Sequence, residues 1–341
     1  MAYDMHAAKI TWSENGDGYT IVQDGMKIES MKPQPKPRTK WFNNILEANG
    51  NTPLSKLNRI PEKKSLKCNI YLKLEYFNVA GSLEDRSAIR MIEVAEQHGL
   101  KKGATVIAPA SGNIAISIAL VCAVKGYKAM IPENGTNETF SCENSQIEFV
   151  TKYAISSKCI IVTPDRPSHD IADIMTALDA QVIRTNNGKT PESPDSHYAY
   201  AKLIAEGIPN SYFLDENISG ANALTHYETT ANEIVTALNS KVDLVIVPVR
   251  TGAALTGISK FFKQHHPGTK IYGVRSHDED FPPIPELSTG NLPSVANFSD
   301  VTGMEIVRSK EAFLMTRELI KEEGLMVGPS SGAGVCAAFR V

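Results

Sequence analysis

The sequence feature that most constrains the fold is a regular alternation of short apolar runs with amphipathic stretches from Trp41 onward. Runs typical of buried strands are IYLKL, ATVIAPA, CIIVTP, QVIRT, DLVIVPV and KIYGV. Between them lie helix-like stretches such as SAIRMIEVAEQHG, ISIALVCAVKGY, IADIMTALDA and LTGISKFFKQHH. Repeated strand, helix, strand units favour parallel sheets with helices on both faces. The pattern therefore predicts an α/β protein.

Composition narrows the classes of function. A formal net charge of -3 gives no reason to expect nucleic acid or an anionic membrane as partner. The longest apolar runs, Ile114 to Val124 and Leu244 to Val249, are too short to span a bilayer, and the N-terminus lacks an apolar signal core, so we expect a cytoplasmic protein. The five cysteines are scattered and form no CxxC, which predicts neither a disulfide framework nor a metal site.

Ligands of open parallel sheets bind beyond the carboxyl ends of the strands, so the loops that follow the strands are where a site is expected. The chain has no GxGxxG and no GxxxxGK[ST], which argues against a dinucleotide fingerprint and a Walker phosphate loop. Four other loops carry the information on function.

The first of these loops lies in ILEANGNTPLSKLNRI and YLKLEYFNVAGSLEDRSAIRMIEVAE. It resembles the opening of the pyridoxal-phosphate-dependent β-synthases, the cysteine synthase and cystathionine β-synthase kind, whose lysine motif reads roughly GSVKDR. GSLEDR puts Glu84 at that lysine position. In the family the lysine forms a Schiff base with the cofactor and then shuttles a proton, and a carboxylate can do neither. Unless a nearby lysine such as Lys73 substitutes, the resemblance implies no catalytic residue, and we expect no bound cofactor.

The second loop, APASGNIAIS, resembles the family loop that holds the substrate carboxylate. The resemblance makes Ser111, Gly112 and Asn113 candidate substrate-binding residues, and Asn113 also a ligand of the cofactor ring. Ala110, Ile114 and Ala115 stand where Thr, Thr and Gly are usual. These changes remove two hydroxyls and add bulk, so weakened substrate affinity is expected.

The third loop, VRTGAALTG, is similar to the family's glycine-rich phosphate cradle. Thr251 and Gly252 remain as candidate cofactor-binding residues. Arg250, Ala253 and Ala254 replace Gly, Gly and Thr. An alanine where the backbone needs a positive φ is strained by about 1 kcal/mol or more, yet Arg250 is itself able to pair with an anion, so this loop is ambiguous.

The fourth loop, EGLMVGPSSGAGV, resembles the family loop whose first serine bonds the pyridine nitrogen, which makes Ser330 the remaining candidate cofactor ligand. In the stretch before the third loop, His226 and Tyr227 invite an acid/base role. A helix that opens with THYETT is expected to cap and pack instead, and no third member of a triad is apparent.

The resemblance implies a fold-type II, tryptophan synthase β-like architecture, with two parallel-sheet α/β domains and the cofactor cleft between them. We expect a flexible tail at 1–40, a large domain from 41–76 plus 191–341, and a small domain at 77–190. An insert near 133–158 interrupts the family pattern, and the chain stops within a helix, as a truncated C-terminus would.

Three functions remain open from the sequence. The leading hypothesis is a non-catalytic or severely impaired module of cysteine and cystathionine synthesis, which acts as a homodimer or by pairing with an active β-synthase module. The second is a working cystathionine β-synthase or cysteine synthase that replaces the β-substituent of serine or O-acetylserine. The third is a sensor that binds an amino acid or a C-terminal peptide in the old cleft.

Overall fold

A computed structural model describes residues 9–12, 19–23, 26–28, 41–127, 159–164, 170–185, 193–277, 283–284, 287 and 292–341. The chain divides into two compact units, Met1–Asn43 and Asn44–Val341. In the first unit, β1 (Lys9–Trp12), β2 (Tyr19–Gln23) and β3 (Met26–Ile28) form a small antiparallel sheet. This sheet falls within the predicted tail at 1–40, where no strands were expected. The insert predicted near 133–158 lies outside the described residues.

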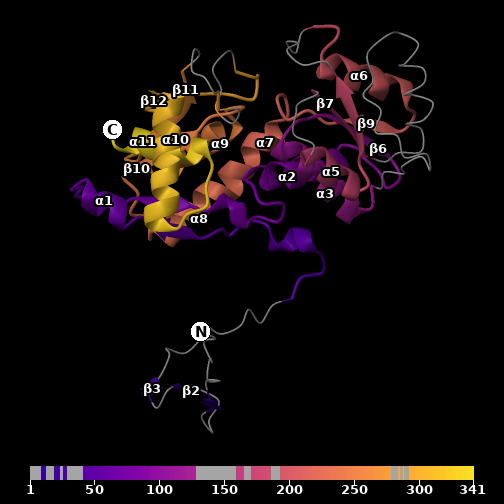
Figure 1. Ribbon diagram of the computed structural model, residues 1–341. Helices are drawn as coiled ribbons and strands as arrows, with labels where there is room; N and C mark the ends of the chain where they lie inside the picture. Colours follow the sequence, from indigo (N-terminus) through magenta and orange to yellow (C-terminus); the bar gives the residue numbers. More distant parts are fainter. Residues whose placement is uncertain are drawn as a thin grey trace. The chain divides into compact units, whose positions relative to one another are not determined.

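The second unit contains a four-stranded parallel sheet in the order β8-β7-β6-β9. Its strands are β6 (Thr105–Pro109), β7 (Cys159–Pro164), β8 (Gln181–Thr185) and β9 (Ser211–Phe213). Every residue of β6 is buried, as expected for a central strand with both faces covered. Helices α2 (Glu84–Gln97), α3 (Asn113–Lys125) and α5 (Asp170–Ala177) pack on the face that carries Val106 and Ala108. Helix α6 (His197–Gly207) packs on the face that carries Ile107. Figure 1 labels β6, β7 and β9 in the same part of the molecule as α2, α3, α5 and α6.

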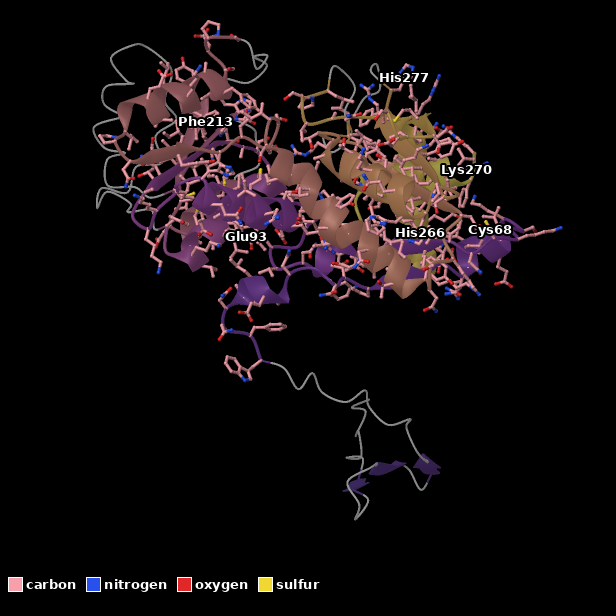
Figure 2. The ribbon with its side chains drawn as sticks, turned by 180° about the vertical axis from the view of Figure 1, so that it is seen from behind. Cys68, Glu93, Phe213, His266, Lys270 and His277 are labelled. Carbon is pink, nitrogen blue, oxygen red and sulfur yellow. The ribbon has the colours of Figure 1, made fainter. Side chains whose placement is uncertain are left out.

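A second parallel sheet has the order β10-β11-β12, from β10 (Leu244–Pro248), β11 (Lys270–Ser276) and β12 (Gly303–Val307). One core cluster joins it to α8 (Ala231–Ala237) and α9 (Ala253–His265), and another joins it to α10 (Ser309–Glu318) and α11 (Pro329–Ala338). Seen from behind, Phe213 and Glu93 lie in the part of the molecule with the first sheet, and His266, Lys270 and His277 lie in the other part (Figure 2). Parallel sheets with helices on both faces confirm the predicted α/β class.

The start of the second unit packs onto its C-terminal helices. Strands β4 (Leu54–Lys56) and β5 (Tyr71–Lys73) form an antiparallel pair, accompanied by short helices η1 (Ile45–Ala48), α1 (Arg59–Lys63) and η2 (Glu75–Phe77). Leu57, Ile60 and Leu74 share a core cluster with residues of α10, α11 and the π-helical turn η4 (Leu319–Glu323). We call the elements around the first sheet, α2 to β9, the β6 half. The elements around the second sheet, together with β4 and β5, are the β10 half.

The chain passes between the two halves through α7 (Gly220–Thr225) and the π-helical turn η3 (His226–Thr230). The close approach of α7 and α9 requires Gly257, where a Cβ atom would lie 2.1 Å from the carbonyl oxygen of Ala223. Strand β9 pairs with β6 although it follows residue 190, so the first sheet extends beyond the predicted small domain. Sequence spacing does not reveal this pairing, because the partners Thr105 and Ser211 are far apart in the chain. No helix among the described residues is long and apolar enough to cross a membrane.

Arg86, in the first turn of α2, is the centre of a buried ion cluster that joins the halves. Its guanidinium donates to Glu75 at 2.7 Å from Nε and to Glu233 at 2.7 Å from Nη1. Lys73 Nζ donates to the same Glu233 at 2.6 Å, and Thr52 Oγ1 donates to Glu75 at 2.6 Å. The Arg86 side chain is only 1% exposed. Because the other members of the cluster lie before β4 and on β5, η2 and α8, the cluster joins α2 to the β10 half.

The cluster predicts that part of the stability of the fold is lost in acid through Glu233. Burial raises the pKa of Glu233, but hydrogen bonds from Arg86 and Lys73 outweigh it and lower the pKa from 4.5 to about 2. The contribution of the ionised Glu233 to the stability of the fold is therefore complete above pH 4.5 and is lost as the pH falls through 2. We expect Glu233→Gln to lower the free energy of unfolding at pH 7 by about 3 kcal/mol. Between pH 4.5 and 2, the free energy of unfolding of Glu233→Gln should fall less steeply with decreasing pH than that of the wild type.

Urea denaturation at a series of pH values measures both effects. Glu206→Gln, at an exposed position of α6, is the control for loss of one carboxylate. Equal slopes for the wild type and Glu233→Gln between pH 4.5 and 2 would contradict the prediction.

Candidate active site

Glu84 is held at the start of α2 by hydrogen bonds of the GSLEDR loop. Ser82 Oγ accepts from the Glu84 amide at 3.2 Å. Asp85 accepts from the Ala80 amide at 2.8 Å and from Ser117 Oγ at 2.5 Å, which ties the loop to α3. Burial raises the pKa of Asp85, against the effect of these bonds. The first turn of α2 is thus fixed, and Glu84 has a defined place at the carboxyl edge of the first sheet.

Arg250 pairs directly with Glu84. It follows β10, and its Nε donates to Glu84 Oε1 at 3.1 Å. Its Nη2 donates to Glu216, which lies in the loop after β9. The side chains of Arg250, Glu84 and Glu216 are 28%, 19% and 5% exposed. We call these residues the Arg250 triad; it joins the two loops of the β6 half to the loop after β10.

The electrostatics of the triad follow from burial and pairing. Burial lowers the pKa of Arg250, but attraction to Glu84 and Glu216 outweighs it, and the net pKa is raised. Burial raises the pKa of Glu216, repulsion from Glu84 and Asp215 adds to this, and together they outweigh the lowering by Arg250. Arg250 is thus a permanent cation whose two described ionic partners belong to the protein itself. In the structure, the anions beside Arg250 are carboxylates of the chain itself.

Lys73 does not take the place of a lysine at position 84. Its Nζ donates to the Thr52 carbonyl at 3.0 Å, to Thr52 Oγ1 at 2.8 Å and to Glu233 at 2.6 Å. These bonds hold its ammonium group in the Arg86 cluster. The oxygens of Thr52 and the carboxylate of Glu233 accept these hydrogen bonds, so the amine of Lys73 is bound within that cluster.

The second loop keeps its backbone form but buries the residues that differ from the family. Gly112 has φ +69° and precedes α3, which begins at Asn113. Asn113 is exposed and Ser111 is half-buried. Ala110, Ile114 and Ala115 are each at most 3% exposed and belong to the core of the β6 half. The bulk added at Ile114 is therefore accommodated in the core around α3.

The third loop corrects the expectation of strain at the alanines. The positive φ, +89°, falls on Gly252, and α9 begins with Ala253. Neither Ala253 nor Ala254 is among the described residues with positive φ. A Cβ at Gly252 would lie 2.6 Å from the Cβ of Ala296, so glycine is required there for space as well as for conformation. The strain prediction was wrong because the alanines are helical residues.

The remaining candidates lie at or just before helix starts. Ser330 is half-buried in the first turn of α11, which packs against the end of β10, where Pro248 lies 3.5 Å from a Cβ built at Gly334. Thr251 is half-buried before α9, where its Oγ1 accepts from the Ala253 amide at 3.4 Å. Within the described part of the chain, no hydrogen bond joins Asn113, Thr251 and Ser330. The structure joins Glu84 and Arg250 by a direct side-chain hydrogen bond.

Glu216 is the site residue that sequence reasoning missed. It lies in LDENIS, directly after β9, and a run of polar residues after a strand was the available signal. Its neighbour Asp215 accepts from the Asn217 amide at 2.8 Å, and Asn217 donates to the hydroxyl of Tyr198. Burial raises the pKa of Asp215 and of Tyr198. Glu216 thus belongs to a buried polar loop rather than to an isolated pair.

His226 is part of the packing between α2 and η3. It is 1% exposed, with Nδ1 at 2.9 Å from Thr230 Oγ1 and Nε2 at 3.4 Å from Ser87 Oγ. Burial lowers the pKa of His226 to about 4, so the ring is neutral near pH 7. Tyr227 Oη donates to Gln264 Oε1 at 2.7 Å, on α9. These contacts agree with the expected packing roles.

Comparisons with known proteins identify the relatives of the chain. A family model described as "Pyridoxal-phosphate dependent enzyme" matches residues 45–138 and 152–341. Cystathionine beta-synthase of Rattus norvegicus is 34% identical over 320 residues, which cover 90% of this chain and 52% of the relative. A probable cysteine synthase of Bacillus subtilis is 32% identical over 309 residues, covering 87% and 88% of the two chains. The chain spans about half the length of the cystathionine beta-synthases that it matches.

A solved structure supports the fold. The crystal structure of a hydrogen sulfide-producing enzyme from Fusobacterium nucleatum has a TM-score of 0.72 and 29% sequence identity to this chain. The match covers 89% of this chain and 92% of that one. It agrees with the predicted fold-type II architecture.

These findings correct the expectation of a chain without a cofactor, because the matching family is one of cofactor-dependent enzymes. The residues of the site fit such a group in part. Gly252 supplies the tight turn that a phosphate cradle needs, whereas Glu84 has no nitrogen for a covalent link and is bound to Arg250. The match covers most of the chain and agrees with the fold. The chain belongs to the family of pyridoxal-phosphate-dependent enzymes.

Proposed function

We propose that this chain is a β-synthase-like module of sulfur amino-acid metabolism that is non-catalytic or severely impaired, and that it acts in association with an active module. The observation that carries the proposal is the Glu84–Arg250 ion pair at the position of the family's lysine. Nucleophilic attack on an aldehyde and transfer of an α-proton both need an amine that loses its charge during the cycle. A carboxylate paired with a guanidinium provides neither function.

The ion pair involves two positions that differ from the family, so the substitution at position 84 has to be considered together with the one at position 250. Family resemblance places lysine at position 84 and glycine at position 250. In this chain an anion and a cation stand at those two positions, and they bond to each other at 3.1 Å. The two changes are therefore coupled, and each stabilises the other in a partly buried place where a lone charge is costly.

A second function has support from the comparisons. Relatives that cover most of this chain carry the names cystathionine beta-synthase and probable cysteine synthase. A working enzyme would replace the β-substituent of serine or O-acetylserine, and it would need an amine other than that of Lys73. The exposed Asn113 and the half-buried Ser330 remain in place for such a role. A third function, a sensor of amino acids or C-terminal peptides, would use the same loop at the start of α3.

Turnover by the purified protein separates these functions. The assays, with pyridoxal phosphate present, follow formation of cystathionine from serine and homocysteine and of cysteine from O-acetylserine and sulfide. We expect both rates to be at least about 10⁴-fold below an ordinary enzyme rate of about 10 s⁻¹. Mass spectrometry of the products measures this. Turnover at an ordinary rate that Ser330→Ala abolishes would establish the active enzyme instead. Calorimetry with serine and with a C-terminal peptide tests the sensor.

Association is measured by sedimentation of the protein alone and mixed with an active cystathionine β-synthase. The proposal expects a mixed species or altered activity of the active enzyme. Sedimentation as an independent species, with unchanged activity of the other enzyme, would contradict the role in association.

Restoring the family residues tests the coupling of positions 84 and 250. Glu84→Lys alone places a second cation beside Arg250, so we expect a lowered melting temperature and no gain of lysine-bound cofactor. The double variant Glu84→Lys with Arg250→Gly removes the competing guanidinium. We expect it to gain cofactor that borohydride fixes to the introduced lysine, as measured by absorbance and peptide mass spectrometry.

Arg250→Gly alone is the matched control, since it opens the same space without supplying an amine. If Glu84→Lys alone fixed as much cofactor as the double variant, Arg250 would not be the obstacle. If neither Glu84→Lys nor the double variant fixed cofactor, the coupling of positions 84 and 250 would be contradicted, and the second loop would be the site of the defect.

A further inference from the structure

The first turn of α2 makes two separate ionic links to the β10 half. Glu84 bonds to Arg250 in the loop after β10, and Arg86 bonds to Glu233 on α8. Two residues along a helix are about 200° apart around its axis, so these side chains leave α2 on nearly opposite faces. The start of α2 is therefore pinned from two sides, at two different places in the β10 half.

The two links differ in burial and in the number of their bonds. Arg86 is 1% exposed and donates to Glu75, Glu233, Thr52 and Thr229. Arg250 is 28% exposed and donates only to Glu84 and Glu216 among the described residues. Water competes more effectively for the partly exposed pair, and breaking the buried cluster leaves more charge without a partner. The Arg250 triad is therefore the link that opens first.

The positions of the triad decide what its opening would do. Glu84 and Glu216 both belong to the carboxyl edge of the first sheet, at the start of α2 and in the loop after β9. Arg250 lies two residues beyond the end of β10, at the carboxyl edge of the second sheet. Arg86 instead bonds to Glu75, just after β5, and to Glu233 on α8. Neither bond of Arg250 involves a member of the Arg86 cluster, so loss of the triad removes no bond of that cluster.

We propose that Arg250 is a latch that holds the carboxyl edges of the two sheets together across the site, with the buried Arg86 cluster as the hinge. Opening breaks the bonds of Arg250 to Glu84 and to Glu216 and exposes both carboxylates to water. A site with lysine at 84 and glycine at 250 would have no such link. The latch is independent of whether the chain is an enzyme.

Hydrogen exchange of the full-length protein, followed by mass spectrometry, tests the latch. Arg250→Met keeps an apolar stem and removes the charge. We expect amide exchange at least about tenfold faster in two segments that are distant in sequence, 80–85 and 248–256, with the segment around Arg86's partner Glu233 protected as in the wild type. Glu84→Gln should accelerate exchange in 248–256 as well, because coupling between two sites is reciprocal.

The control is Arg340→Met, which removes an ion pair to Glu311 at 2.8 Å within the β10 half alone. It should leave both segments unchanged. Acceleration by Arg250→Met confined to 248–256 would show local loosening and overturn the latch, as would unchanged exchange in both segments. If Arg250→Met proved unstable, Glu84→Gln and Glu216→Gln each remove one arm, and the same two segments decide the outcome.

Discussion

The pairing of the buried Arg86 guanidinium with Glu75 and Glu233 is the interaction on which the rest of the second unit depends. A charge that is almost completely removed from water is tolerated only when carboxylates surround it with good geometry. Glu75 and Glu233 meet that requirement, with Thr52 and Lys73 completing the cluster. Because these residues come from β5, η2, α8 and the turn before β4, the position of α2 is set by the β10 half. Because Glu84 lies at the start of the same helix, this cluster also fixes the position of Glu84.

The fold follows from the sequence to a large extent, because its signals are local. Apolar runs such as ATVIAPA and DLVIVPV indicate buried strands. The first run forms β6, an inner strand of its sheet, and the second forms β10, which pairs with the central strand β11. The strand order is less accessible to such reasoning. Strand β9 joins β6 through Thr105 and Ser211, and nothing in either run of residues reveals the partner. The short strands β1 to β3 were also missed, since their runs are brief and lie among Gly and charged residues.

The site could be predicted by position but less well by contact. Resemblance located Glu84, Arg250 and Ser330 in the loops after strands or at helix starts, where the structure has them. The bond between Glu84 and Arg250 joins residues from separate halves, so spacing alone could not reveal it. Glu216 was missed for the same reason. Ala253 was misjudged because the positive φ of the loop is taken by Gly252, one residue earlier.

The burial of Ile114 has a consequence for the order in which such a site changes over time. Glu84 and Arg250 are partly exposed, so side chains of other polarity at these positions can still reach water. Ile114 is 1% exposed and fills space between α3 and its neighbours. A threonine there would bury a hydroxyl and leave a gap in the packing, and both effects cost free energy. A return of Ile114 to threonine is therefore costlier than a change at Glu84 or Arg250, and a lineage that regained lysine at 84 and glycine at 250 would still carry isoleucine at 114.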